Sequence, residues 1–116
     1  MPFILTRESI LSAEDLKPFP VDVPEWGKDA QVIVRRLDGA GRKALMNAIS
    51  GLKEDTEIQR AVAVHCIVNQ DGSRVFTDTD ADLLATKAGN VIARIADAAF
   101  DLNRIGKTAV ENIEKN

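Results

Sequence analysis

The single histidine and the single cysteine of this 116-residue chain are neighbours, His65 and Cys66. Such a pair could act as a nucleophile with its base, but adjacent residues of a helix point about 100° apart. A zinc site would need further cysteine or histidine ligands, and the sequence has none. Because both residues lie in the apolar run Ala61–Val68, we predict a core histidine beside a buried thiol.

Three alternating aspartates, Asp78, Asp80 and Asp82, have the spacing that opens a calcium-binding loop. The rest of that pattern is missing. Its sixth position, which requires glycine, is Leu83, and its twelfth, which requires a bidentate glutamate, is Gly89. Together with Thr77 and Thr79, these acids are typical of a capped helix start, where the helix dipole favours negative charge.

The one cluster of basic residues in the sequence consists of Arg35, Arg36, Arg42 and Lys43. The segment Gly39–Lys43 lacks the glycine and lysine spacing of a phosphate-binding loop. A nucleic-acid surface would need more positive charge with aromatic or polar readers between, and the net charge is −3. We therefore expect a solvated face, or a contact for an acidic patch on a protein partner.

None of these candidates supports catalysis, a cofactor or a metal, which favours a non-enzymatic domain that binds other proteins. Hydrophobic residues make up 45% of the chain, enough for a core, and the lone cysteine allows no intrachain disulfide. The sequence shows neither a signal peptide nor an apolar run of the roughly 20 residues that span a membrane. We expect a soluble cytosolic protein with a single domain over residues 1–116.

The N-terminal third is predicted to be extended instead of helical. Phe19, Val21 and Val23 alternate with proline and aspartate, which is typical of a strand with one buried face. Proline restricts it to an edge strand or a bound extended arm. Ala30–Leu37 is rich in β-branched residues, so residues 1–37 are predicted to hold a hairpin or an extended arm.

Helical periodicity begins at Asp38, a good N-cap, and covers residues 38–105. The first helix has an apolar stripe, and a second helix over residues 57–69 is expected to be central and buried. Its run Val62–Val68 would also suit a buried strand. The stripe of the first helix consists of Leu37, Gly41, Ala44, Leu45, Ala48, Ile49 and Leu52.

Further elements complete the prediction. A short helix is expected from Thr77 to about Lys87 and a longer one from about Val91 to Ile105, followed by a flexible tail over residues 106–116. One helical turn is predicted at Ser12–Asp15. The fold class is α+β, mainly α, with a hairpin or arm ahead of a compact bundle of about four helices.

Trp26, the only tryptophan, stands in the turn of the predicted hairpin beside Gly27. It either caps the core under the hairpin or forms an exposed hot spot for a partner. The hairpin and the tail are the segments whose own core looks insufficient, so we expect them to engage neighbours. The predicted partner-binding residues are Phe19, Val21, Val23, Trp26, Arg35 and Arg36.

The ordered series of segments resembles the tail assembly chaperone family of long-tailed, lambda-like bacteriophages and prophages. Their order and spacing over most of the chain carry the resemblance. The segments are VDVPEWG at 21–27, VIVRRLDG at 32–39 and its following helix, VNQDGSRVFTD at 68–78 with the acidic helix start up to Leu84, and AFDLN at 99–103.

The resemblance implies a chaperone in the host cell cytoplasm that is absent from the mature virion. It implies binding to the tape measure protein, which is kept soluble, and recruitment of tail tube protein. It also implies a homo-oligomer and association with a longer frameshifted form. The last residues, Glu114, Lys115 and Asn116, can be encoded as GAA-AAA-AAC, which contains a slippery heptamer.

Two other functions fit the same sequence. One is another head–tail morphogenesis protein, such as a connector or tail terminator, which would be found in the virion. The other is a small DNA-binding regulatory domain that uses the helices around Arg42, although the acidic balance of the chain argues against it.

Overall fold

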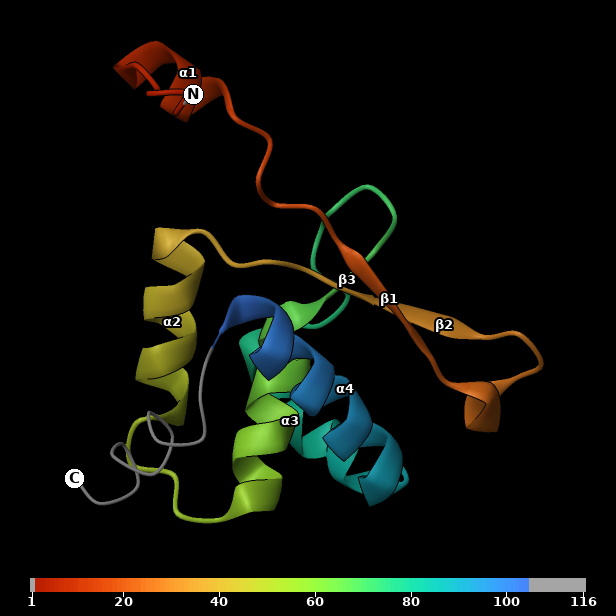
Figure 1. The fold of residues 1–116 in the computed structure, drawn as a ribbon. Coiled ribbons are helices and arrows are strands. Elements are labelled where there is room, and N and C mark those ends of the chain that lie inside the picture. The colour runs from red at the N-terminus through yellow and green to blue at the C-terminus, as the bar shows by residue number, and fades with distance from the viewer. Residues whose placement is uncertain (1, 105–116) are drawn as a thin grey trace.

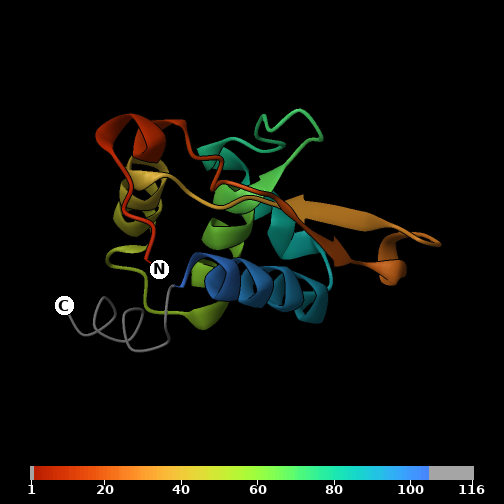
Figure 2. The same cartoon turned by 45° about the horizontal axis from the view of Figure 1, so that its top comes forward.

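A computed structural model describes residues 2–104 of the chain. The fold is α+β and mainly helical, as predicted, with a three-stranded sheet beside a group of helices (Figures 1 and 2). The elements in chain order are α1 (Arg7–Ser12), β1 (Phe19–Asp22), the 3-10 turn η1 (Pro24–Trp26), β2 (Gln31–Val34), α2 (Gly39–Ile49), α3 (Asp55–Cys66), β3 (Ile67–Val68), the 3-10 segment η2 (Asp78–Thr86) and α4 (Gly89–Asn103).

The predicted hairpin is confirmed. Strands β1 and β2 pair antiparallel, with Phe19 opposite Val34, and the sheet order β1-β2-β3 puts β1 at an edge. That position suits Pro20, because an edge strand does not need every N–H donor. At the turn, Gly27 has a φ of 152° and Asp29 a φ of 59°, backbone conformations in which glycine and aspartate are tolerated.

The second predicted helix ends three residues earlier than expected, at Cys66 rather than Asn69. Ile67 and Val68 form β3 and pair antiparallel with Val34 and Ile33 of β2. The amide of Arg35 continues this pairing, since it donates to the carbonyl of Cys66 at 2.9 Å. Strand β2 would otherwise be left with unpaired buried backbone groups, and that need overrides helical continuity.

The helical turn predicted at Ser12–Asp15 is wrong, because the helix there is α1, over Arg7–Ser12. A reciprocal cap starts it: the Thr6 amide donates to the Ser9 hydroxyl at 2.8 Å, and the Ser9 amide donates to the Thr6 hydroxyl at 3.2 Å. Two hydroxyl side chains satisfy the first free N–H groups, so this cap starts the helix earlier in the chain.

Helix α2 begins as predicted, with the Asp38 carboxylate accepting from the Gly41 amide at 2.7 Å. Its buried face is narrower than the predicted stripe. Leu45 and Ile49 are buried, whereas Ala44 and Ala48 are exposed to solvent. Helix α2 therefore covers α3 along one edge and leaves a row of small residues uncovered.

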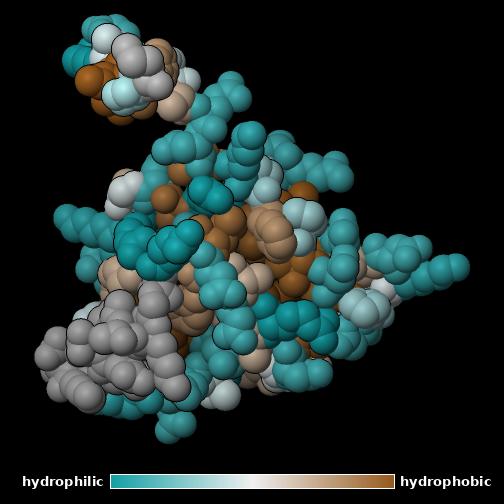
Figure 3. All heavy atoms as spheres, viewed as in Figure 1, coloured by the Kyte–Doolittle hydropathy of each residue, from teal (hydrophilic) through white to brown (hydrophobic). Residues whose placement is uncertain are grey.

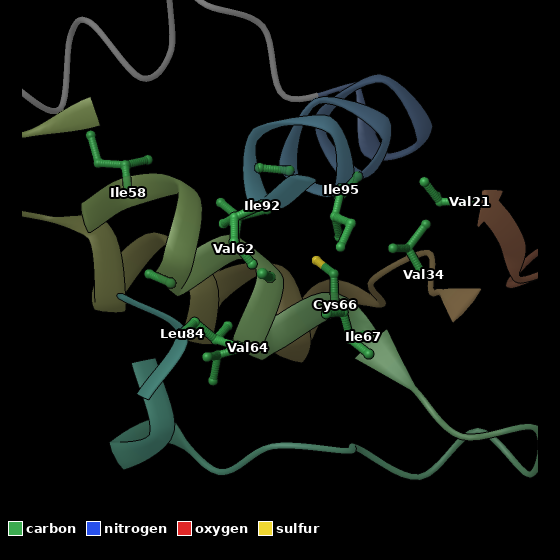
Figure 4. Packing of buried hydrophobic residues seen from close by; sticks show 14 of the residues in the cluster. Val21, Val34, Ile58, Val62, Val64, Cys66, Ile67, Leu84, Ile92 and Ile95 are labelled. Carbon is green, nitrogen blue, oxygen red and sulfur yellow. The ribbon is translucent and has the colours of Figure 1, made fainter. Parts of the chain in front are cut away.

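Helix α3 is the central, buried helix, as expected. Figure 4 shows Val62 and Cys66 on the side of α4 and Val64 beside Leu84 of η2. Ile95 of α4 is fully buried in the same cluster. The apolar side chains of α3 thus fill the space between α4, η2 and the sheet, which fixes the positions of the surfaces described below.

The segment predicted as a short α-helix after Thr77 is the 3-10 segment η2. Its start follows the prediction, with the Thr77 amide donating to the Asp80 carboxylate at 2.9 Å. Helix α4 begins at Gly89 and ends at Asn103, because Arg104 adopts a left-handed φ of 55°. The predicted helix end at Ile105 and the predicted flexible tail, residues 106–116, lie outside the described residues.

Candidate partner-binding surfaces

His65 and Cys66 are both buried, as the sequence predicts. Burial and the positive charge of Arg74 lower the pKa of His65, against the opposing effect of Asp78, whose carboxylate lies 3.6 Å from the imidazole Nε2. Burial raises the pKa of Cys66 to about 11. Burial therefore favours the uncharged imidazole of His65 and the uncharged thiol of Cys66, and an uncharged thiol is the unreactive form of a cysteine.

Within residues 2–104, no cluster of three or more histidine, cysteine or acidic side chains is placed to hold a metal ion. Asp78, the first residue of the apparent calcium pattern, instead accepts from Arg74 Nη1 at 2.7 Å. This interaction lowers the pKa of the Asp78 carboxyl. In the same part of the chain, no helix has the length and apolar character needed to cross a membrane.

Trp26 is the last residue of η1, in the turn between β1 and β2, and is 40% exposed. The ring therefore packs partly on the hairpin and presents the rest of its surface to solvent. It borders a hollow of about 350 Å³ between the sheet and the loop that follows β3. The lining residues are Trp26, Gln31, Val32, Ile33, Ile67, Val68, Asn69, Gln70, Val75, Phe76 and Leu84. We call this the tryptophan hollow.

Arg94 of α4 holds the hairpin tip in place. Its guanidinium donates to both carboxylate oxygens of Glu25, at 2.8 and 2.5 Å, and to the carbonyl of Asp22 at 3.2 Å. The hydrogen bonds from Arg94 lower the pKa of Glu25 to about 2. A two-pronged contact of this kind fixes orientation as well as distance, so the tip that carries Trp26 has a defined place against α4.

Phe19 and Arg36 meet at the other end of the hairpin. They line a second hollow of about 530 Å³ with the C-terminal part of α4, and Phe19 is 49% exposed. The remaining lining residues are Ala98, Asp101, Leu102 and Arg104. We call this the phenylalanine hollow. Its two arginines and one aspartate give it a positive balance.

Arg35 and Arg42 are engaged within the fold. Arg35 Nε donates to the His65 carbonyl at 2.9 Å, and Arg42 Nη1 donates to the Asn103 carbonyl at 2.7 Å. Asn103 joins the same region, since its side chain accepts from the Leu37 amide and donates to the Arg35 carbonyl. The basic cluster is thus divided, with two of its arginines tying β2 and α2 to the ends of α3 and α4.

The six predicted partner-binding residues therefore do not form one patch. Val21 and Val23 are buried in the core, 6% and 1% exposed, so neither side chain is displayed. Trp26 lies at one end of the hairpin, and Phe19 lies with Arg36 at the other. Alternation along the strand correctly predicted a buried face, but it does not show which residues of the hairpin remain exposed to solvent.

The sequence reasoning missed a larger groove between α2, α3 and η2, of about 670 Å³. Small residues line much of it, and the exposed alanines of α2 form one wall. Their four-residue spacing was the available signal, but it was read as core. The lining residues are Ala44, Asn47, Ala48, Leu52, Glu57, Arg60, Ala61, Val64, His65, Asp78, Ala81 and Asp82. We call this the alanine groove.

The N-terminal arm, residues 2–18, was also missed as a candidate surface. Figures 1 and 3 show it standing clear of the helices and sheet, with hydrophobic side chains on its surface. None of the six residues of α1 is buried. The exposed large apolar residues of the arm are Phe3 (84%), Ile4 (86%), Leu5 (48%), Ile10 (57%), Leu11 (68%) and Leu16 (50%).

Comparisons with known proteins identify the family. A family model described as phage tail assembly chaperone matches residues 12–116. Among solved structures, the bacteriophage HK97 tail assembly chaperone is similar, with a TM-score of 0.58 and 19% sequence identity over 82% of this chain and 94% of that one. That likeness supports the fold, while no curated protein matches the chain. Because the family model covers nearly the whole sequence, the chain belongs to the phage tail assembly chaperone family.

Proposed function

We propose that this chain binds the tape measure protein of its phage and keeps it soluble until the tail tube forms around it. The observation that carries the proposal is the half-exposed Trp26 on a hairpin tip that Arg94 holds against α4. Membership of the tail assembly chaperone family supports the general role. The proposal adds the partner and the surface.

The family resemblance implies that the tape measure protein is a long and largely helical chain, which is exposed to solvent before the tail tube forms around it. Its apolar side chains must be covered until assembly, or the chains aggregate. An amphipathic helix is recognised by a hollow that takes its apolar anchors. The tryptophan hollow offers Val32, Ile33 and Phe76 as an apolar floor beside the indole ring, and tryptophan is enriched among residues that dominate binding energy.

The phenylalanine hollow is the proposed contact for the tail tube protein. Arg36 and Arg104 give this hollow positive charge around an apolar centre formed by Phe19 and Leu102. An acidic surface on a tube subunit would complement it, and such charge pairing chiefly sets specificity and the rate of encounter. The two hollows lie at opposite ends of one hairpin, so both partners could bind together.

Three further properties complete the proposal. The chain associates with itself and with a longer frameshifted form, it acts in the host cell cytoplasm, and it is absent from finished particles. Mass spectrometry of purified virions tests the last point, because a connector or tail terminator would be present in them. The nucleotide sequence over Glu114–Asn116 tests the frameshift.

A binding titration tests the central proposal. Purified chain is titrated into soluble fragments that tile the tape measure protein, with an unrelated helical protein of similar length as the control. The proposal predicts saturable binding to at least one fragment and none to the control. Equal binding to both, or binding to neither, would contradict it.

A further inference from the structure

The N-terminal arm exposes large apolar side chains that do not pack into the core of its own chain. Its three most N-terminal large residues, Phe3, Ile4 and Leu5, precede α1 and stay largely exposed. Residues 2–11 also lie before the range that the family model matches. Exposed apolar surface of this extent marks a contact with another molecule.

The surface that such a segment would cover is large enough for a specific contact. The exposed parts of Phe3, Ile4 and Leu5 amount to on the order of 450 Å², so two such arms, together with the two surfaces that receive them, bury about the area of an interface of standard size. If two copies exchange arms reciprocally, each supplies one arm and one receiving surface. Such two-fold exchange of an identical element is a common route to dimers.

The alanine groove has the form to receive this segment. Its volume of about 670 Å³ lies in the usual range of roughly 300–1,000 Å³ for binding sites. Ala44 and Ala48 on one wall and Ala61 and Ala81 on the others leave space that no large side chain of the groove fills. Large side chains on the arm and small ones in the groove are complementary in shape.

Charge supports the same pairing. Asp78 is already paired with Arg74, so Glu57 and Asp82 line the groove against the cation Arg60 and leave its lining with a small negative balance. Burial favours the neutral form of His65, which lowers its pKa. The first part of the arm, residues 2–7, carries one charged side chain, Arg7, which is 78% exposed. An apolar segment that ends in Arg7 therefore suits a groove that combines alanine and other apolar side chains with a slightly acidic lining.

We propose that residues 2–7 of one copy bind in the alanine groove of a second copy, and that this exchange holds the homo-oligomer together. The inference rests on the self-association proposed above and assigns its contact. It is independent of the tryptophan hollow, so tape measure binding can be scored separately.

Sedimentation velocity over a wide range of concentrations tests the exchange with two variants. F3S/I4S removes the two most exposed apolar side chains of the arm, and A44L/A48L fills the groove with good helix formers. Each variant alone should raise the dissociation constant of self-association about tenfold or more. Leu83→Ser is the matched control, because Leu83 is 64% exposed but lies outside both arm and groove; it should associate like the original chain.

Mixing the two variants gives the decisive result. A mixed pair has one intact arm facing one intact groove, so an affinity-tagged F3S/I4S chain should capture A44L/A48L better than either variant captures itself. No gain on mixing, or unchanged association of F3S/I4S, would overturn the exchange. If F3S/I4S changes the sedimentation coefficient equally at all protein concentrations, the arm binds the groove of its own chain, and the exchange between copies is wrong. An original chain that stays monomeric would refute self-association itself, leaving tape measure binding to its own titration.

Discussion

Replacing Trp26 with alanine separates the binding role of the hairpin tip from its structural role. The indole is 40% exposed, so the substitution removes both a surface offered to a partner and a surface packed on the hairpin. We therefore predict two quantities for the same variant, the change in Kd for the partner and the change in the free energy of unfolding.

The exposed fraction sets the expected loss of binding. A tryptophan presents roughly 250 Å², so about 100 Å² is available to a partner, worth about 2 kcal/mol when covered, or roughly thirtyfold in Kd. The remaining area of roughly 150 Å² corresponds to about 2–3 kcal/mol of unfolding free energy after allowance for a compact unfolded state. A domain with an ordinary stability of about 5–15 kcal/mol stays folded after this loss.

The assay is a titration against a tape measure fragment well below the melting temperature of the variant. Met46→Ala is the matched control, because Met46 packs against the core from α2, outside the tryptophan hollow. It should lower the unfolding free energy by about 2 kcal/mol and leave Kd unchanged. If Trp26→Ala lowers stability but changes Kd less than about threefold, Trp26 serves the hairpin core alone and the proposed surface is wrong.

Three further predictions concern the core. Ile95→Ala should lower the unfolding free energy by about 3 kcal/mol in urea denaturation, because Ile95 is fully buried; a loss under about 1 kcal/mol would contradict its place there. His65 has a pKa lowered from 6.5 in the folded chain, so the unfolded chain binds more protons and stability should fall as pH drops through about 6.5; His65→Gln should flatten that dependence, and an equal slope in both proteins would refute the cause. The Cys66 thiol, with its pKa raised to about 11, should react with iodoacetamide far more slowly in the folded chain than in urea, whereas equal rates would show that it is accessible.

The parts of the fold that the sequence predicted are those decided by local patterns. Alternation of Val21 and Val23 predicted the buried face of an edge strand, and Asp38 predicted the start of α2. The sequence also placed His65 and Cys66 in the core, because neither their spacing nor their neighbours supported chemistry. Periodicity and capping depend on few residues, so they can be read without tertiary structure.

The parts that it missed depend on tertiary contacts. Helix α3 ends at Cys66 because Ile67 and Val68 pair with β2. The sequence allowed a buried strand within Val62–Val68, but the apolar run alone does not show where the helix stops and the strand begins. Ala44 and Ala48 fit an apolar stripe, yet α2 meets α3 only along one edge and leaves them uncovered. Similarly, Arg94 of α4 holds the hairpin tip through Glu25, which lies 69 residues away in the chain, and a single sequence does not reveal such a pairing.

Co-expression of this chain with the full tape measure protein tests whether the chain binds that protein and keeps it soluble. The measured quantity is the fraction of tape measure protein that stays in the supernatant and copurifies with the chain, compared with expression alone and with Trp26→Ala. With the original chain we expect a largely soluble complex, with Trp26→Ala a smaller soluble fraction, and without either chain an aggregated tape measure protein. Tape measure protein that stays insoluble in every case, or soluble without copurifying, would contradict it.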